Sequence, residues 1–245
     1  MPNDFVILTR ARSGSNSLMS RLDSCPDVVC HGEIFKPRRI DMRRDYRPRL
    51  PVDEVGARNA DPLGFIAGIR RLDPDKHVGF KIFPHQLAAV PAAIEHIAAP
   101  ATLRIVLTRA PLEAYASGLR MRATGVHKRK EDTPAAVLTA PVRFTPKSFR
   151  RFAAVHNRFM TMARLIAAAP GSFVIDYAQI NDPAALDALF GFVGSRARAA
   201  DSRTAYSKQY AGRLEDGIAN WGELQDFLRR AAPPLLAAPP PSCPG

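Results

Sequence analysis

The sequence has few cysteines and no long apolar run. Its three cysteines, Cys25, Cys30 and Cys243, include no C-x-x-C pair, so neither a disulfide framework nor a zinc site is expected. No uncharged apolar stretch approaches the ~20 residues that cross a bilayer, and the opening MPNDFVILTR lacks the pattern of a signal peptide. We therefore expect a cytoplasmic protein without a membrane-spanning helix.

Acidic residues are also scarce relative to basic ones. The chain has 23 Asp and Glu against 35 Lys and Arg, which gives a net charge of +12. Such a charge suits a nucleic-acid binder, a membrane-surface protein or an enzyme that acts on polyanionic substrates. Because no helix-turn-helix, zinc-finger or RNP signature is present, we do not expect nucleic acid to be the partner.

Short apolar runs alternate with helical patterns along the 245 residues. Strands are expected at 5–9, 77–83, 102–108 and 172–177, and helices at 15–23, 61–70, 85–98 (one or two), 111–123, 145–170, 182–194 and 214–230. This alternation predicts an α/β fold whose mostly parallel central sheet is flanked by helices. Residues 1–230 are expected to form one domain, with loops at 36–49 and 124–146 (the latter a loop or lid) and a disordered proline-rich tail at 231–245.

A loop of small polar residues joins the first expected strand to its helix. Ligands of parallel sheets bind at the carboxyl ends of strands, where a helix N-terminus and consecutive N–H groups hold anions. The loop lacks the G-x-x-x-x-G-K-[ST] spacing of nucleotide-hydrolysing loops, so it predicts a cradle for another anion, although a simply capped helix start remains open. The candidate anion-binding residues are Arg12, Ser13, Gly14, Ser15, Asn16 and Ser17.

A second candidate pair follows the strand expected at 102–108. Arg109 ends that strand, and Ser117 lies eight residues later, about two turns into the next helix. Together they could hold a second phosphate, although a surface arginine and a small helix residue would have the same spacing.

Taken together, the two motifs resemble those of sulfotransferases that use 3′-phosphoadenosine 5′-phosphosulfate (PAPS), of the bacterial carbohydrate type that includes the nodulation-factor and trehalose enzymes. The family loop P-[KR]-S-G-[ST]-x-x-L corresponds to residues 11–18, with Ala11 in place of proline, and its strand, Arg, seven residues, Ser motif corresponds to Arg109 and Ser117. The stretches 173–194 and 212–228 are also similar, although the family's Y-E-D-L is Tyr177-Ala178-Gln179-Ile180 here.

The resemblance implies a P-loop-like three-layer sandwich and transfer of a sulfuryl group to a hydroxyl without a metal. The loop would hold the 5′-phosphosulfate and Arg109 with Ser117 the 3′-phosphate, while Tyr177 would lie near the adenine and Arg12 would also stabilise the transition state. The acceptor would be a small molecule, an oligosaccharide or a glycolipid.

A general base is the remaining catalytic group that the reaction needs. Glu33, in CHGEIF (30–35), matches the base position of the bacterial enzymes, and His85 is the second candidate. His85 is two residues out of frame with the histidine of the cytosolic branch, since Phe83 stands at that position. His31 ranks third, and Lys81 could contact the sulfonate or the acceptor.

The basic segments 36–49 and 119–130 are expected to flank the mouth of the site and attract anions. Peripheral membrane contact and a homo-oligomer stay open. A P-loop-like kinase or nucleotide-binding protein is the alternative function, but the loop lacks Lys-[ST], and the third strand ends in Thr108-Arg109 without a magnesium-binding Asp. A basic nucleic-acid-binding protein is a weaker alternative.

Overall fold

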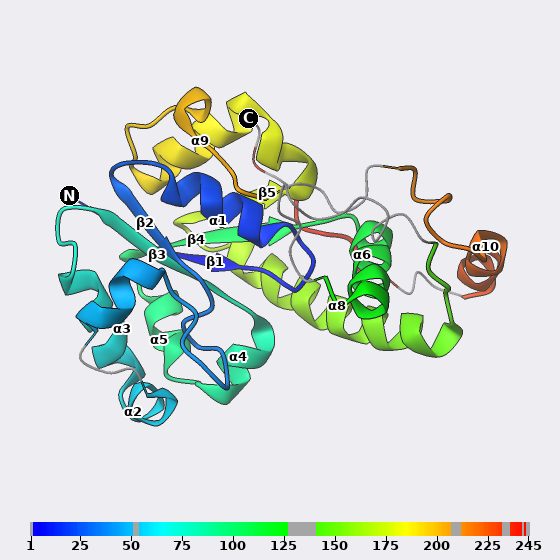
Figure 1. Ribbon diagram of the computed structural model, residues 1–245, viewed down its shortest axis with the longest axis horizontal. Helices are drawn as coiled ribbons and strands as arrows, with labels where there is room; N and C mark the ends of the chain where they lie inside the picture. The colour runs from blue at the N-terminus through cyan, green and yellow to red at the C-terminus, as the bar shows by residue number, and fades with distance from the viewer. Residues whose placement is uncertain are drawn as a thin grey trace.

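The fold is built on five parallel strands. The computed structural model describes residues 2–50, 54–126, 141–206, 212–231, 236–241 and 243. Within them one sheet has the strand order β2-β3-β1-β4-β5 (Figure 1). Its strands are β1 (Asp4–Leu8), β2 (Val28–His31), β3 (His77–Ile82), β4 (Thr102–Thr108) and β5 (Ser172–Asp176).

The strand order changes direction beside β1. The chain adds β2 and β3 on one side of β1 and then β4 and β5 on the other. In the parallel register, Leu8 at the end of β1 lies opposite Ile82 of β3 and Val106 of β4. The carboxyl ends of β1 and β4 therefore adjoin at the switch point where open α/β sheets bind their ligands.

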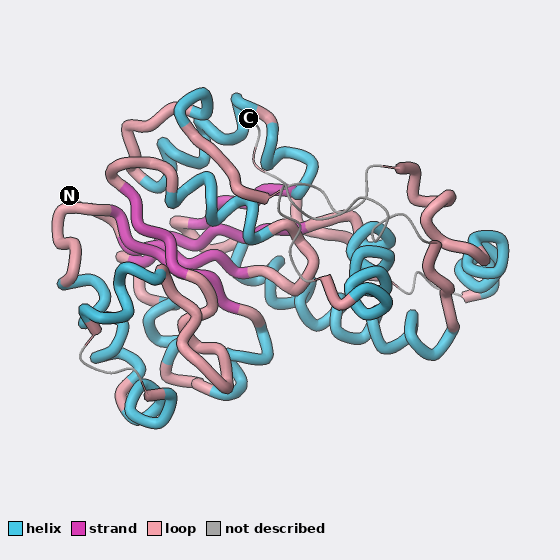
Figure 2. Tube along the Cα trace, in the orientation of Figure 1, coloured by secondary structure: helices cyan, strands magenta, loops and turns pink. Residues whose placement is uncertain are grey.

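Helices cover both faces of the sheet (Figure 2). They are α1 (Ser15–Asp23), α2 (Val55–Ala60), α3 (Pro62–Arg71), α4 (Pro84–Ala89), α5 (Ala93–Ala98), α6 (Pro111–Thr124), α8 (Pro146–Ala167), α9 (Pro183–Val193) and α10 (Trp221–Arg230), with 3₁₀ turns η1 (Arg44–Arg49), η2 (Tyr177–Asn181) and η3 (Ala199–Asp201). Helices α1 and α9 pack on one face, and α3, α5 and α8 pack on the other. The start of α8 packs with α6 and α10 in a separate cluster, beyond the carboxyl ends of the strands in Figure 1.

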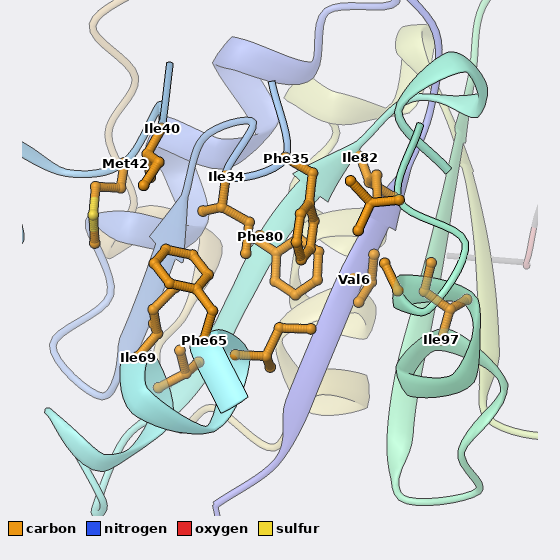
Figure 3. Close-up of a cluster of buried hydrophobic side chains, with 14 of the residues drawn as sticks. Val6, Ile34, Phe35, Ile40, Met42, Phe65, Ile69, Phe80, Ile82 and Ile97 are labelled. Carbon is orange, nitrogen blue, oxygen red and sulfur yellow. The ribbon is translucent and has the colours of Figure 1, made fainter. Parts of the chain in front are cut away.

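Both faces of β1 are buried, which explains its uninterrupted apolar run. Phe5 and Ile7 belong to the core beneath α1 and α9, whereas Val6 and Leu8 belong to the opposite core, and none of the four is exposed. Figure 3 shows the second core, where Phe35, Phe80 and Ile82 gather around Val6. This packing sets the position of the loop that follows β1.

Caps and prolines define several helix starts as the sequence indicated. The Thr145 side chain accepts a hydrogen bond from Ser148 N at 3.2 Å, with Pro146 in the first turn of α8. Asp61 caps α3 in the same way, accepting from Gly64 N at 2.9 Å. The predicted α/β fold with a parallel central sheet flanked by helices is confirmed.

Four elements differ from the prediction. Strand β2 was missed because a four-residue run is too short to stand out, and it is defined by its pairing with β3. Part of the expected loop 36–49 forms η1, and α2 follows it. The last helix begins at Trp221 rather than 214, because turns around a bridge between Val142 and Ile218 precede it. Most of the loop or lid expected at 124–146 lies outside the described residues.

The described part of the C-terminal segment contacts α8 and β5. Ala237 N donates to Asn157 Oδ1 at 2.9 Å, and Cys243 N donates to Val174 O, on the outer strand β5, at 2.9 Å. We expected a disordered segment at 231–245, and these residues of it are hydrogen-bonded to the fold. Across the described ranges, no helix has both the length and the apolar composition needed to cross a bilayer.

Candidate active site

The loop between β1 and α1 turns through two left-handed residues. Arg12 has φ +71° and Gly14 has φ +88°, and Gly14 is the residue that caps α1. The first N–H groups of a helix have no acceptor within it, so the loop directs donors and the positive end of the α1 dipole toward one point. The hydroxyl of Thr9 donates to Ser13 Oγ at 2.6 Å and stabilises the base of the loop.

Arg12 connects the two predicted motifs directly. Its Nε and Nη2 atoms donate to Ser117 Oγ on α6 at 3.1 Å and 3.0 Å. Ser117 is reached because α6 starts immediately after β4, whose carboxyl end adjoins that of β1. The spacing of Arg109 and Ser117 therefore places a helix hydroxyl against the loop.

Arg109 contacts the backbone of the same loop. Its Nη1 donates to the carbonyl of Arg12 at 3.1 Å, and its Nη2 pairs with Glu113 at 3.0 Å. The guanidinium also lies 3.9 Å from the centroid of the Tyr177 ring, a cation–π distance. Arg109 thus holds the backbone of the loop and faces the same side as Tyr177.

Tyr177 packs on the one residue of the loop that lacks a side chain. A Cβ added at Gly14 would collide with the Tyr177 ring. The tyrosine begins η2 at the end of β5, so three strand ends contribute to the site. The contact of Tyr177 with the loop therefore depends on a glycine at position 14.

The electrostatics of the loop favour an anion. Burial and, to a smaller extent, the positive charge of Arg109 together lower the pKa of Arg12 to about 10, while Tyr177 opposes both effects. Two arginines held close together disfavour each other's charge unless a negative group lies between or beside them. A ligand with several negative charges would relieve this cost.

Glu33, Lys81 and Asn16 form a second group next to the loop. Lys81 Nζ lies 3.4 Å from Glu33 Oε1 and donates to Asn16 Oδ1 at 3.0 Å. Lys81 is on β3 and points toward α1, while Glu33 follows β2, so strand pairing brings the two together. Lys81 therefore links the carboxylate predicted as the base to Asn16, in the predicted anion-binding segment 12–17.

The two histidine candidates are placed differently. His85 is exposed on α4, and its ring contacts Phe83, with centroids 5.8 Å apart. His31 is fully buried at the end of β2, and neither of its ring nitrogens has a hydrogen-bond partner among the described residues. Burial and the nearby Arg43 lower the pKa of His31 to about 4, so the ring is neutral at physiological pH.

The remaining predicted residues lie at the same end of the sheet. Ser15 is buried in the first turn of α1, and Ser17 Oγ lies 3.0 Å from the hydroxyl of Thr204. The segment 36–49 continues directly from Glu33, whereas 127–130 of the second basic segment is outside the described ranges. In the part of the chain that the structure describes, no group of three or more His, Cys, Asp or Glu side chains could hold a metal ion.

Sequence reasoning missed Gln86 and Arg10. Gln86 Nε2 donates to Glu33 Oε2 at 2.8 Å. Arg10 donates to His156 Nδ1 at 2.7 Å, and burial lowers the pKa of Arg10 to about 10. Because Nδ1 accepts this bond, the proton of His156 lies on Nε2, which donates to Ala237 O at 3.0 Å. A Pro-x-Gln sequence after a strand signals a capping glutamine, but both contacts depend on elements far apart in sequence.

Comparison with known proteins identifies one relative over nearly the whole chain. Nodulation protein H of Rhizobium tropici is 25% identical over 236 residues, which cover 91% of this chain and 88% of that protein. No family model matches.

Solved sulfotransferase structures align over similar spans. One from Alicyclobacillus acidocaldarius is 17% identical with a TM-score of 0.47, covering 93% of this chain and 91% of its own. A mouse sulfotransferase complexed with PAP is 11% identical with a TM-score of 0.48, covering 94% and 86%. The chain is thus similar to a nodulation protein over nearly its whole length. In the structure the loop and the Arg109–Ser117 pair, the two motifs of the sulfotransferase resemblance, meet at adjoining strand ends.

Proposed function

We propose that this protein transfers the sulfuryl group of PAPS to a hydroxyl of a carbohydrate or glycolipid. The observation that carries the proposal is the meeting of Arg12, Arg109 and Ser117 at the adjoining carboxyl ends of β1 and β4. Two arginines and a helix N-terminus at one point suit a nucleotide that carries phosphate groups at two positions.

Donor binding divides between the two motifs. The loop from Arg12 to Ser17 would hold the 5′-phosphosulfate through its N–H groups, hydroxyls and the α1 dipole. Arg109 and Ser117 would hold the 3′-phosphate. Tyr177, whose ring lies against Gly14 and Arg109, would place its face near the adenine.

Transfer requires a base and a stabilised leaving group. As the acceptor oxygen bonds to sulfur in line with the departing 5′-phosphate oxygen, Glu33 takes the hydroxyl proton, and the S–O bond to the phosphate breaks. The leaving group is adenosine 3′,5′-bisphosphate, and Arg12 and the loop N–H groups would stabilise the charge that develops on its 5′-phosphate oxygen. A positioned carboxylate base contributes roughly 10²–10⁴-fold.

The acceptor would approach from the side of Glu33. The segment 36–49 starts beside that carboxylate, since Lys36 N donates to Glu33 O at 3.0 Å, and Arg38 and Arg39 are exposed on it. These cations would attract the donor and a sugar acceptor that carries or adjoins negative charge, including one presented at an anionic membrane surface.

Calorimetric titration with adenosine 3′,5′-bisphosphate tests donor recognition without knowledge of the acceptor. We expect micromolar binding, and folded protein that does not bind the nucleotide would exclude the proposal. Transfer of ³⁵S from labelled PAPS to a panel of oligosaccharides and glycolipids, with EDTA present, then tests the reaction. Label transfer only to phenols or peptides would exclude the proposed acceptor class, and loss of activity in EDTA would favour a kinase-like, metal-dependent enzyme.

A further inference from the structure

The side chain of Gln86 has only one orientation that its neighbours allow. Gln86 is fully buried at the third position of α4, and its Oε1 accepts a hydrogen bond from Phe83 N at 3.0 Å. Its Nε2 then faces the Glu33 carboxylate at 2.8 Å. Turning the amide over would set two N–H donors against each other and an oxygen against a carboxylate, so both contacts fix the same orientation.

The Glu33 carboxylate is consequently held at both oxygens. Gln86 donates to Oε2, while Oε1 faces the buried Lys81 ammonium at 3.4 Å, and Lys81 also donates to Asn16 in the donor loop. The Glu33 side chain is 12% exposed, so these contacts lie where water screens little. Contacts at both oxygens therefore fix the orientation of the carboxylate beside the loop between β1 and α1.

We propose that Gln86 is a positioning residue for the Glu33 carboxylate, holding it in one rotamer beside the loop between β1 and α1. The proposal rests on the base role of Glu33 given above. Gln86 touches neither donor nor acceptor in this scheme and acts through Glu33 alone.

A second glutamine shows what a purely capping role would look like. Gln179 Oε1 accepts from Asp176 N at 2.9 Å, in the same arrangement at the start of η2, but its Nε2 donates to the carbonyl of Cys243 at 3.5 Å. Capping thus needs only the amide oxygen. Gln179 is therefore the matched control.

The ¹³C resonance of the Glu33 carboxyl group tests the proposal without an acceptor. The chain has seven glutamates, so labelling of the glutamate side-chain carboxyl groups gives seven resonances, and Glu33→Gln identifies that of Glu33. Gln86→Met removes the donor at similar volume, and we expect the Glu33 resonance to move and broaden, because the carboxylate loses the contact at Oε2 and samples more than one rotamer. Gln86→Glu keeps the capping oxygen but sets a second carboxylate against the first, so the Glu33 resonance should move there too. Gln179→Met should leave the Glu33 resonance unchanged.

Three results distinguish the proposal from its alternatives. If both Gln86 variants melt at a lower temperature while the Glu33 resonance stays at its wild-type position, Gln86 is only a helix cap, and the proposal is wrong. If Gln179→Met moves that resonance as far as Gln86→Met does, the effect is global and the proposal is equally wrong. If the Gln86 variants move the resonance but Glu33→Gln retains wild-type ³⁵S transfer, the contact exists while the base role of Glu33 fails, which overturns the proposed mechanism and with it the role of Gln86. Binding of adenosine 3′,5′-bisphosphate should be unchanged in every variant.

Discussion

Arg12 donates two hydrogen bonds to the hydroxyl of Ser117, a residue 105 positions later in the chain. The two residues belong to motifs that are unrelated in sequence, one after β1 and the other on the helix after β4. Their contact, together with the hydrogen bond from Arg109 to the Arg12 carbonyl, joins the two motifs at adjoining strand ends.

Replacing Arg109 should remove donor affinity without unfolding the protein. In Arg109→Ala we expect adenosine 3′,5′-bisphosphate to bind roughly 10–100-fold more weakly, since a charged hydrogen bond contributes about 1.5–3 kcal/mol. Calorimetry measures the loss. Arg71→Ala, an exposed arginine at the end of α3, is the control and should bind as wild type does. Equal affinity in the two variants would contradict the assignment of Arg109.

Gly14→Ala should disrupt the loop itself. The residue has φ +88°, and a Cβ there would collide with the Tyr177 ring, so the variant combines backbone strain with a steric clash. We expect a loss of about 1–3 kcal/mol in the free energy of unfolding and weaker nucleotide binding. Gly68→Ala in α3 meets no atom within 4 Å and should stabilise by about 0.5–1 kcal/mol. Chemical denaturation compares the two, and an unaffected Gly14→Ala would show that the loop tolerates a side chain.

Glu33 and His85 can be separated as candidate bases by substitution. Glu33→Gln should lower kcat by roughly 10²–10⁴-fold while nucleotide binding persists. His85→Gln should retain most activity, because His85 is exposed on α4, where its ring contacts Phe83. The measurement is kcat with any acceptor found in the panel. The reverse pattern would make His85 the base.

His31 should make the protein sensitive to acid. Its folded pKa of about 4 is below the ordinary value of 6.5, so the unfolded chain binds more protons between these values. Stability is therefore complete above pH 6.5 and falls as the pH drops toward 4, by at most about 3 kcal/mol from this residue. Arg43 opposes protonation, whereas Asp45 and Asp73 favour it to a smaller extent.

The control for this prediction is His31→Phe, which keeps a ring against Tyr46 without a titrating group. Denaturation at several pH values should show a shallower loss of stability between pH 6.5 and 4 in the variant. If the stability of the two proteins falls equally as the pH drops, protonation of His31 does not destabilise the folded state.

The local sequence pattern was sufficient to predict most of the strands and helices that position the site. The apolar runs of β1, β3, β4 and β5 are buried on both faces, so hydrophobicity alone reveals them. Caps such as Thr145-Pro146 and Asp61-Pro62 act within one turn of helix and can be read from neighbouring residues. Strand β2 could not be predicted in this way, because its four residues form a strand only through pairing with β3.

The amino-acid sequence by itself determined an α/β chain with a loop of small polar residues at 12–17 and a second arginine at the end of a strand. These features depend on residues within a few positions of one another. Only the tertiary structure decided that Arg12 meets Ser117, that Lys81 links Glu33 to Asn16, and that Gln86 holds the other carboxylate oxygen. Each of these contacts joins side chains from different strand ends, and the strand order that brings them together is set by packing across the whole sheet rather than by any local pattern.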